Sequence, residues 1–89
     1  MARWETYNNG AYYGDFSFFG KRHGWGVYTW NNGERYEGQW VNGERTGNGT
    51  YWWPNGDVYQ GAFINNTITS SISILNIWAS LAIKIKTCI

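Results

Sequence analysis

The chain has 89 residues, enough for one small domain, and 20% of them are aromatic. Its formal net charge is only +1, so bulk positive charge gives no reason to expect nucleic-acid binding. The single cysteine, Cys88, has no internal disulfide partner and the N-terminal residues do not resemble a secretory signal, so we expect a cytoplasmic protein.

Up to residue 63, short runs rich in aromatic and β-branched residues alternate with turn signals. These runs cover residues 4–7, 12–16, 25–30, 35–40, 49–53 and 58–63. The dipeptide Asn-Gly is a strong hairpin signal, because both residues tolerate the positive φ of a tight turn. It occurs at Asn9-Gly10, Asn32-Gly33, Asn42-Gly43 and Asn55-Gly56. Helical periodicity is not found before residue 64, so the pattern predicts an all-β, antiparallel fold for residues 1–63.

A 23-residue period connects these runs, because the segment 20–33 returns as the segment 43–56. Glycines, aromatics and the Asn-Gly turn recur in register, which is the signature of a repeat array. In the first copy one extra residue at 17–19 shifts the register, and we expect a longer hairpin loop or a bulge there.

Alternation within the strands assigns side chains to faces of the sheet. In the run 35–40, Tyr36, Gly38 and Trp40 share a face that is opposite to Glu37 and Gln39. A glycine within an aromatic face suggests that a ring packs on its backbone, for example Tyr28 over Gly38. The glycines to which we assign a structural role are Gly14, Gly24, Gly26, Gly33, Gly38, Gly47, Gly49, Gly56 and Gly61.

The pattern from Tyr36 to Gly56, Tyr-x-Gly-x-Trp followed by Gly-x-Gly-x-Tyr-x-Trp-x-Asn-Gly, resembles the MORN repeat over about residues 4–63. The resemblance implies β-hairpins that stack into an elongated, twisted single-layer sheet. It also implies a non-catalytic scaffold, associated with the cytoskeleton or membranes, or an accessory module beside an enzyme.

Catalytic and metal chemistry have little support in the sequence. His23 is the only histidine and lacks an identifiable acid partner, so we expect an exposed loop residue. Glu34 and Asp57 occupy matching turn positions 23 residues apart, which indicates a structural role. We therefore expect no enzyme activity, no cofactor and no metal site.

Three kinds of binding remain open. The first is a protein partner, or a second copy of the chain, on the aromatic face of the sheet. The second is binding of acidic membrane lipids through a basic loop strip of Lys21, Arg22 and Arg45. The third is stacking of choline or glycans on the rings. The candidate partner-binding aromatics are Tyr28, Trp30, Tyr36, Trp40, Tyr51, Trp53, Tyr59 and Phe63.

The segment 64–89 departs from the repeat and is rich in Ile, Ser, Thr and Asn. Apolar residues spaced by three or four predict a helix over about 70–84, while the alternation at Ile72/Ile74 and Ile83/Ile85 fits a strand. We interpret this tail as a segment that caps the last hairpin or mediates association. A membrane anchor and an aberrant terminus stay open as alternatives.

Overall fold

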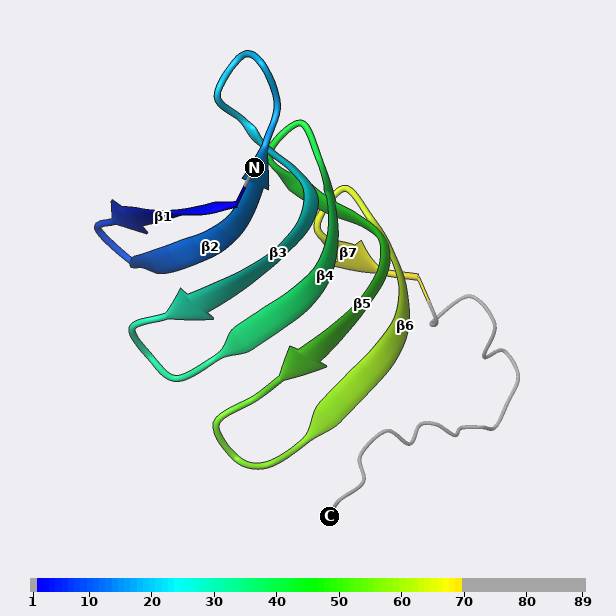
Figure 1. Cartoon of the computed structure of the whole chain (residues 1–89). Coiled ribbons are helices and arrows are strands. Elements are labelled where there is room, and N and C mark those ends of the chain that lie inside the picture. The colour runs from blue at the N-terminus through cyan, green and yellow to red at the C-terminus, as the bar shows by residue number, and fades with distance from the viewer. Residues whose placement is uncertain (1, 70–89) are drawn as a thin grey trace.

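The computed structural model describes residues 2–69, which form one antiparallel sheet whose seven strands follow one another in chain order (Figure 1). This confirms the all-β prediction, and no helix occurs among these residues. The strands are β1 (Arg3–Tyr7), β2 (Gly10–Phe16), β3 (Arg22–Trp30), β4 (Arg35–Val41), β5 (Glu44–Trp52), β6 (Val58–Ile64) and β7 (Thr67–Ile68).

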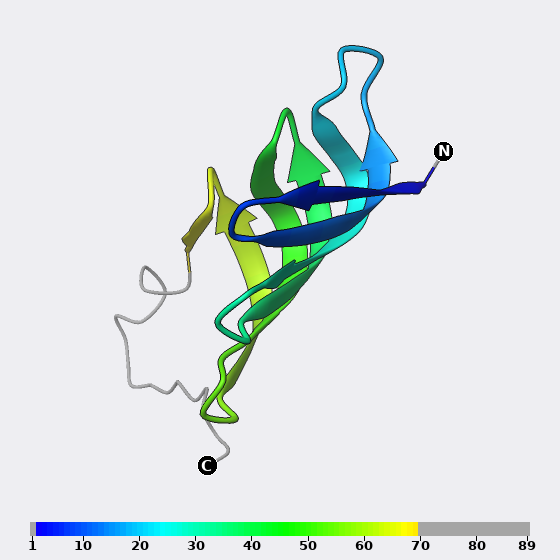
Figure 2. The same cartoon turned by 90° about the vertical axis from the view of Figure 1, so that its left-hand side faces the viewer.

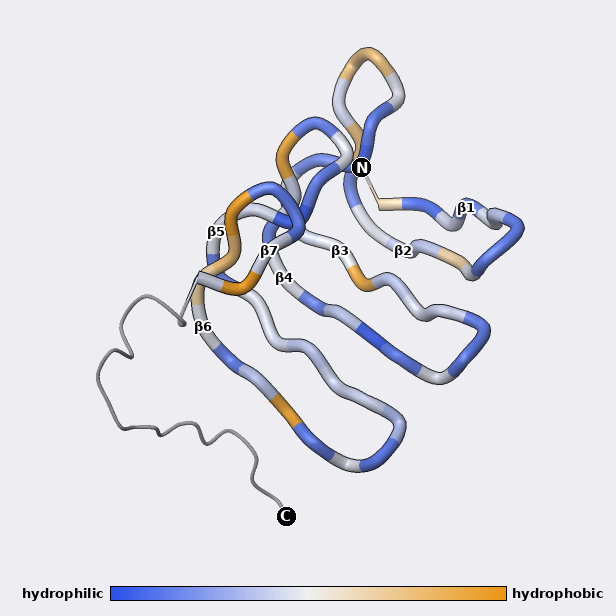
Figure 3. The backbone as a smooth tube through the Cα atoms, turned by 180° about the vertical axis from the view of Figure 1, so that it is seen from behind, coloured by the Kyte–Doolittle hydropathy of each residue, from blue (hydrophilic) through white to orange (hydrophobic). Residues whose placement is uncertain are grey.

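The sheet is a single curved layer, which confirms the architecture that the resemblance implies (Figure 2). Its dimensions are 41 × 23 × 18 Å. In Figure 3 most of the chain is polar or neutral and strongly apolar residues are isolated, so aliphatic side chains do not build a core. The core consists of aromatic rings on one face of the sheet: Tyr12, Tyr28, Tyr36, Trp40, Tyr51, Tyr59 and Phe63, each at most 9% exposed.

Glycines allow these rings to lie flat on a single layer. The ring of Tyr36 covers Gly38 on its own strand and Gly49 on β5, where an added Cβ atom would lie within 3.0 Å of the tyrosine. The Tyr36 hydroxyl then donates a hydrogen bond to the carbonyl oxygen of Gln39, at 2.8 Å. In the preceding repeat the Tyr12 hydroxyl likewise donates a hydrogen bond to the carbonyl oxygen of Asp15, at 2.7 Å.

The expected packing of Tyr28 over Gly38 is therefore wrong, although the idea of a ring on glycine is confirmed. Strand side chains lean along the strand direction, so the glycine two residues ahead on the same strand receives the ring. Tyr59 lies over Gly61 in the same way and donates to the carbonyl of Ala62 at 3.1 Å.

Two kinds of turn connect the strands. At the β3–β4 turn, the N–H of Gly33 donates to the Trp30 carbonyl and the N–H of Trp30 donates to Glu34, with Gly33 at φ +100°. This is a type I turn followed by a glycine bulge, and the Asn32 side chain accepts the N–H of Glu34 at 3.0 Å. The β5–β6 turn at residues 53–57 repeats it. At the β4–β5 turn both Asn42 and Gly43 have positive φ.

The first Asn-Gly pair forms a different turn from the one expected. Tyr7 pairs with Gly10, so Asn8 and Asn9 form the loop and Gly10 is the first residue of β2. An added Cβ at Gly10 would meet the backbone of Thr29. This glycine is required for close approach to β3 rather than for a positive φ.

The longer hairpin loop predicted near residues 17–19 is confirmed, because five residues separate the paired Phe16 and Arg22, whereas four separate the equivalent pair Trp40 and Arg45. The register shift between Gly14 and Phe16 recurs between Gly38 and Trp40, so it belongs to the repeat and not to the extra residue. At the other end, the sheet extends past residue 63 through Ile64, a turn at Asn65 and Asn66 with positive φ, and β7. These residues belong to the predicted tail. The helix expected over 70–84 lies outside the described residues.

Candidate functional site

Two arginines on the aromatic face define the candidate site. The guanidinium carbon of Arg22, on β3, lies 5.1 Å from the ring centroid of Tyr7, 5.3 Å from that of Tyr28 and 5.0 Å from that of Trp40. Its terminal nitrogen donates to the carbonyl oxygen of Gly43 in the β4–β5 turn, at 3.0 Å. Rings and turn thus hold the charged group in a fixed place.

Arg45, which lies 23 residues later on β5, repeats this geometry. Its guanidinium carbon lies 5.2 Å from the ring centroid of Trp30 and 5.4 Å from that of Tyr51. It donates to the backbone and side-chain oxygens of Asn66, at 3.3 and 3.1 Å. Asn66 takes the place of Gly43 in the repeat. Arg22 on β3 therefore bonds to the β4–β5 turn, and Arg45 on β5 bonds to the β6–β7 turn.

Backbone hydrogen bonds also join these turns to the arginine-bearing strands. The N–H of Gly43 donates to the carbonyl of Arg22 at 2.8 Å, and the N–H of Asn66 donates to the carbonyl of Arg45 at 2.9 Å. The backbone therefore fixes the start of each arginine-bearing strand against the next turn. Sequence alone gives both arginines the same repeat position, but it does not reveal this contact.

The two arginines line neighbouring hollows on the aromatic face, which we together call the arginine groove. It consists of three adjoining hollows of about 660, 170 and 370 Å³. The first and second share Arg22 and Tyr28, and the second and third share Arg45 and Asn66. No carboxylate occurs among the lining residues, which are Tyr7, Asn8, Asn9, Arg22, Tyr28, Trp30, Trp40, Gly43, Arg45, Tyr51, Trp53, Phe63, Asn66, Thr67 and Ile68.

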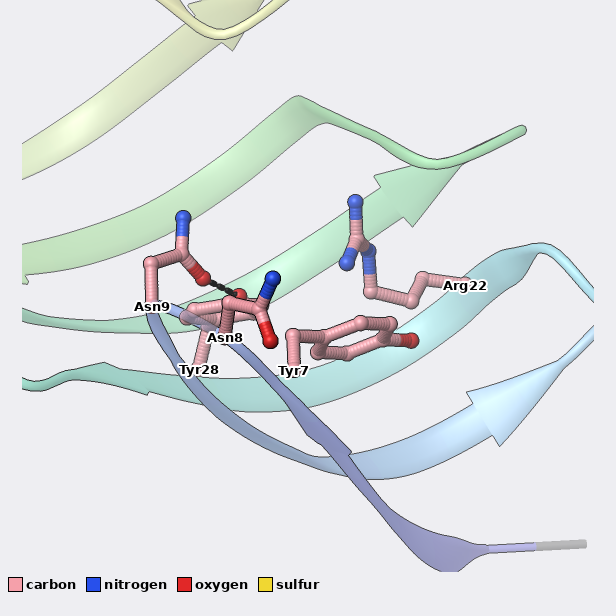
Figure 4. A pocket seen from close by; sticks show the side chains of 5 residues that line it. All are labelled: Tyr7, Asn8, Asn9, Arg22 and Tyr28. Carbon is pink, nitrogen blue, oxygen red and sulfur yellow. Dashed lines mark hydrogen bonds between the residues drawn. The ribbon is translucent and has the colours of Figure 1, made fainter.

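Figure 4 shows the first part of the groove, where Arg22 extends from β3 above the ring of Tyr7. The hydroxyl of Tyr28 donates to the Asn9 side chain in the wall of the same hollow (Figure 4). In the next repeat the Tyr51 hydroxyl donates to the carboxylate of Glu34, at 2.6 Å. Turn residues therefore anchor the equivalent tyrosines.

Burial makes the core tyrosines poor acids. It raises the pKa of Tyr12, Tyr36 and Tyr51 to about 12, because the phenolate form would lose its hydration. The pKa of Tyr28 is also raised by burial, and the charge of Arg22 opposes this shift. These hydroxyls serve as hydrogen-bond donors at neutral pH.

The predicted partner-binding aromatics all lie on the face expected, but most of them form the core. Tyr28, Tyr36, Trp40, Tyr51, Tyr59 and Phe63 are buried. Trp30 and Trp53 are half-buried and line the groove, so they are the members of the predicted set with accessible ring surface.

The predicted basic strip is divided by the structure. Lys21 is exposed in the β2–β3 loop, whereas Arg22 and Arg45 are half-buried in the groove. His23 is exposed, as expected, although it lies within β3 rather than in a loop, and its Nδ1 accepts the N–H of Asn42 at 3.3 Å.

The predicted structural glycines serve two functions. Gly14, Gly26, Gly38, Gly49 and Gly61 lie under tyrosines or against a neighbouring strand. The other four have positive φ: Gly24, Gly33, Gly47 and Gly56.

Two exposed aromatic groups are absent from the predicted sites. Phe18 and Phe19, in the β2–β3 loop, are 95% and 84% exposed. Their signal in the sequence is an apolar pair between Ser17 and Gly20, in a position where turns are usually polar. Trp4 and Trp25 are exposed on the face opposite the groove.

Residues 2–69 contain no cluster of His, Cys, Asp or Glu side chains able to hold a metal ion. In the same part of the chain, no helix is long and apolar enough to cross a membrane.

The fold and groove define a class of protein: an open array of equivalent β-hairpins with a ring-on-glycine core. The chain belongs to the MORN repeat family, whose pattern matches residues 12–35 and 36–58. Modules of this family are generally non-enzymatic and mediate protein or membrane interactions. Comparison with curated proteins gave no match.

Proposed function

We propose that this chain is a non-catalytic scaffold module whose arginine groove binds an acidic segment of a partner protein. The observation that supports this proposal is the pair Arg22 and Arg45, each held over aromatic rings in a groove whose lining contains no carboxylate. A guanidinium is planar, weakly hydrated and suited to bidentate binding of a carboxylate. The half-buried Trp30 and Trp53 supply apolar contact beside these charges.

Charge favours an anionic ligand over choline. A quaternary ammonium group placed on the same rings would meet the positive charges of Arg22 and Arg45, which already occupy the ring faces. A carboxylate would instead gain charge-assisted hydrogen bonds from the same groups.

The position of the arginines favours a peptide over a lipid surface. Both guanidinium groups lie within a hollow and bond to the turns at Gly43 and Asn66. The side chains of an extended peptide can enter such a hollow, whereas a flat headgroup layer first meets exposed cations such as Lys21.

The test uses the full chain and a synthetic peptide that repeats Glu-Gly-Leu four times, with a Gln-for-Glu peptide as its neutral counterpart. We expect saturable binding of the Glu peptide that weakens as salt is added. Arg22→Gln and Arg45→Gln should each reduce the affinity about tenfold, since a hydrogen bond to a charged group contributes about 1.5–3 kcal/mol. Lys21→Gln is the matched control and should change little.

Vesicles of phosphatidylcholine and phosphatidylserine provide the second arm of this test. Equal binding of the Glu and Gln peptides would contradict the groove proposal. So would an equal loss of affinity for the Glu peptide in Arg22→Gln, Arg45→Gln and Lys21→Gln. Loss of vesicle binding in the groove variants without any peptide binding would assign the arginines to lipid headgroups instead. Thermal unfolding of each variant shows whether the fold is retained.

A further inference from the structure

The β2–β3 loop carries the most exposed apolar side chains of the described residues. Phe18 and Phe19 occupy its tip and contact each other edge to face, with ring centroids 5.4 Å apart. The loop extends farther from the sheet than the β4–β5 and β6–β7 turns on the same side (Figures 1 and 2). Those two turns consist of Asn and Gly residues, each preceded by a single exposed aliphatic residue, Val41 or Ile64, so what distinguishes the β2–β3 hairpin is its pair of adjacent exposed rings.

The backbone of the loop is bonded within itself. The N–H of Gly20 donates to the carbonyl of Ser17 at 2.9 Å, and the N–H of Ser17 donates to the carbonyl of Lys21 at 2.8 Å. The Ser17 hydroxyl oxygen accepts the N–H groups of Phe19 and Lys21, at 3.2 and 3.3 Å. Such a tip can enter an apolar medium without leaving these N–H groups unpaired, which is a condition for contact with the lipid interior.

We propose that this loop is a membrane-interface anchor. Phe18 and Phe19 insert at the boundary between headgroups and acyl chains, and Lys21 binds lipid phosphates. The loop projects from the sheet (Figure 1) and carries two exposed rings followed by the cation Lys21, and no carboxylate occurs between residues 17 and 23. Aromatic rings with adjacent positive charge suit the surface of an anionic leaflet. The loop tip is separate from the arginine groove, so an experiment can contradict the membrane anchor without contradicting the peptide-binding proposal.

The proposal is tested by flotation of the full chain with vesicles of phosphatidylcholine and phosphatidylserine. Phe18→Ser and Phe19→Ser should each lower the vesicle partition coefficient about tenfold, because each removes one buried aromatic ring from the lipid. Lys21→Gln should lower the partition coefficient less than the phenylalanine substitutions do. High salt should also lower it, because salt screens the attraction between Lys21 and the lipid phosphates. Trp4→Ser, which removes an exposed ring from the sheet face opposite the groove, is the control and should bind as the unaltered chain does.

A second measurement reports insertion directly. A polarity-sensitive dye is attached at a Phe19→Cys substitution in a Cys88→Ser background. We expect a blue shift with vesicles and quenching by lipids brominated on the acyl chain. Unchanged binding in the two phenylalanine variants, equal loss in Trp4→Ser, or no binding at all would overturn the proposal. A blue shift without vesicles, accompanied by a doubled mass, would assign the tip to self-association instead.

Discussion

The ring of Tyr36 covers Gly49 on the neighbouring strand so closely that a Cβ atom on Gly49 would lie within 3.0 Å of the ring. The same relationship joins Tyr12 to Gly26 one repeat earlier. A single-layer sheet cannot bury side chains between two layers, so each ring must lie flat on backbone. The Tyr-x-Gly element and the glycine of the next strand together make this possible.

Gly49→Ala is therefore expected to destabilise the sheet by about 1–3 kcal/mol, the usual cost of overpacking. The matched control is Thr50→Ala, on the opposite face of the same strand, which should cost less than about 1 kcal/mol. Urea unfolding of both variants measures the difference. A Gly49→Ala protein as stable as the control would show that Tyr36 moves aside without penalty.

Tyr36→Phe keeps the ring and removes the hydroxyl that donates to the carbonyl of Gln39. The free energy of unfolding should fall by about 0.5–1.5 kcal/mol, the net contribution of one hydrogen bond. Tyr13→Phe alters an exposed tyrosine and should have almost no effect. Equal stability of the two variants would remove the hydrogen bond from the explanation of the motif.

The β4–β5 turn depends on the left-handed conformation of Asn42, which has φ +50°. Asn42→Ala should destabilise the protein by about 1–2 kcal/mol, because alanine tolerates this conformation poorly. Asn42→Gly should be close to neutral. A larger loss in the glycine variant than in the alanine variant would contradict this reading of the turn.

Stability should decline in alkaline solution. The pKa of Tyr12, Tyr36 and Tyr51 is about 12 in the folded chain, against an ordinary value of about 10 when unfolded. Between these values the unfolded chain binds fewer protons than the folded chain. The free energy of unfolding therefore keeps its full value below pH 10 and falls as the pH rises toward 12. Urea titrations across this range, with tyrosinate absorbance as a second signal, measure the effect. A flat profile would contradict the burial of these hydroxyls.

The sequence predicts the hairpins and their period because turn residues and strand alternation are local signals. The glycine beneath each ring is harder to predict, because the lean of a side chain along its strand is not contained in the alternation. For this reason the alternation pattern predicts Tyr28 over Gly38, whereas the ring that lies over Gly38 in the structure is that of Tyr36.

The site is predicted less completely than the fold. Repeat equivalence correctly identifies Arg22 and Arg45 as a pair, but charged residues are usually exposed, so the sequence suggests a loop strip. Backbone hydrogen bonds between each turn and the neighbouring strand bring Gly43 and Asn66 to these arginines, and the sequence does not reveal them. Phe18 and Phe19 are absent from the predicted sites, because their exposure depends on how far their loop projects from the sheet, and the sequence pattern does not contain this.

The most direct test of the groove follows the indole N–H signals of the tryptophans by NMR during titration with the Glu-Gly-Leu peptide. Trp30 and Trp53 line the groove, whereas Trp4 and Trp25 lie exposed on the opposite face and serve as controls in the same molecule. We predict saturable shifts of the Trp30 and Trp53 signals, with those of Trp4 and Trp25 unchanged. Shifts confined to Trp4 and Trp25, or no shifts at all, would contradict the proposal that the arginine groove binds an acidic partner.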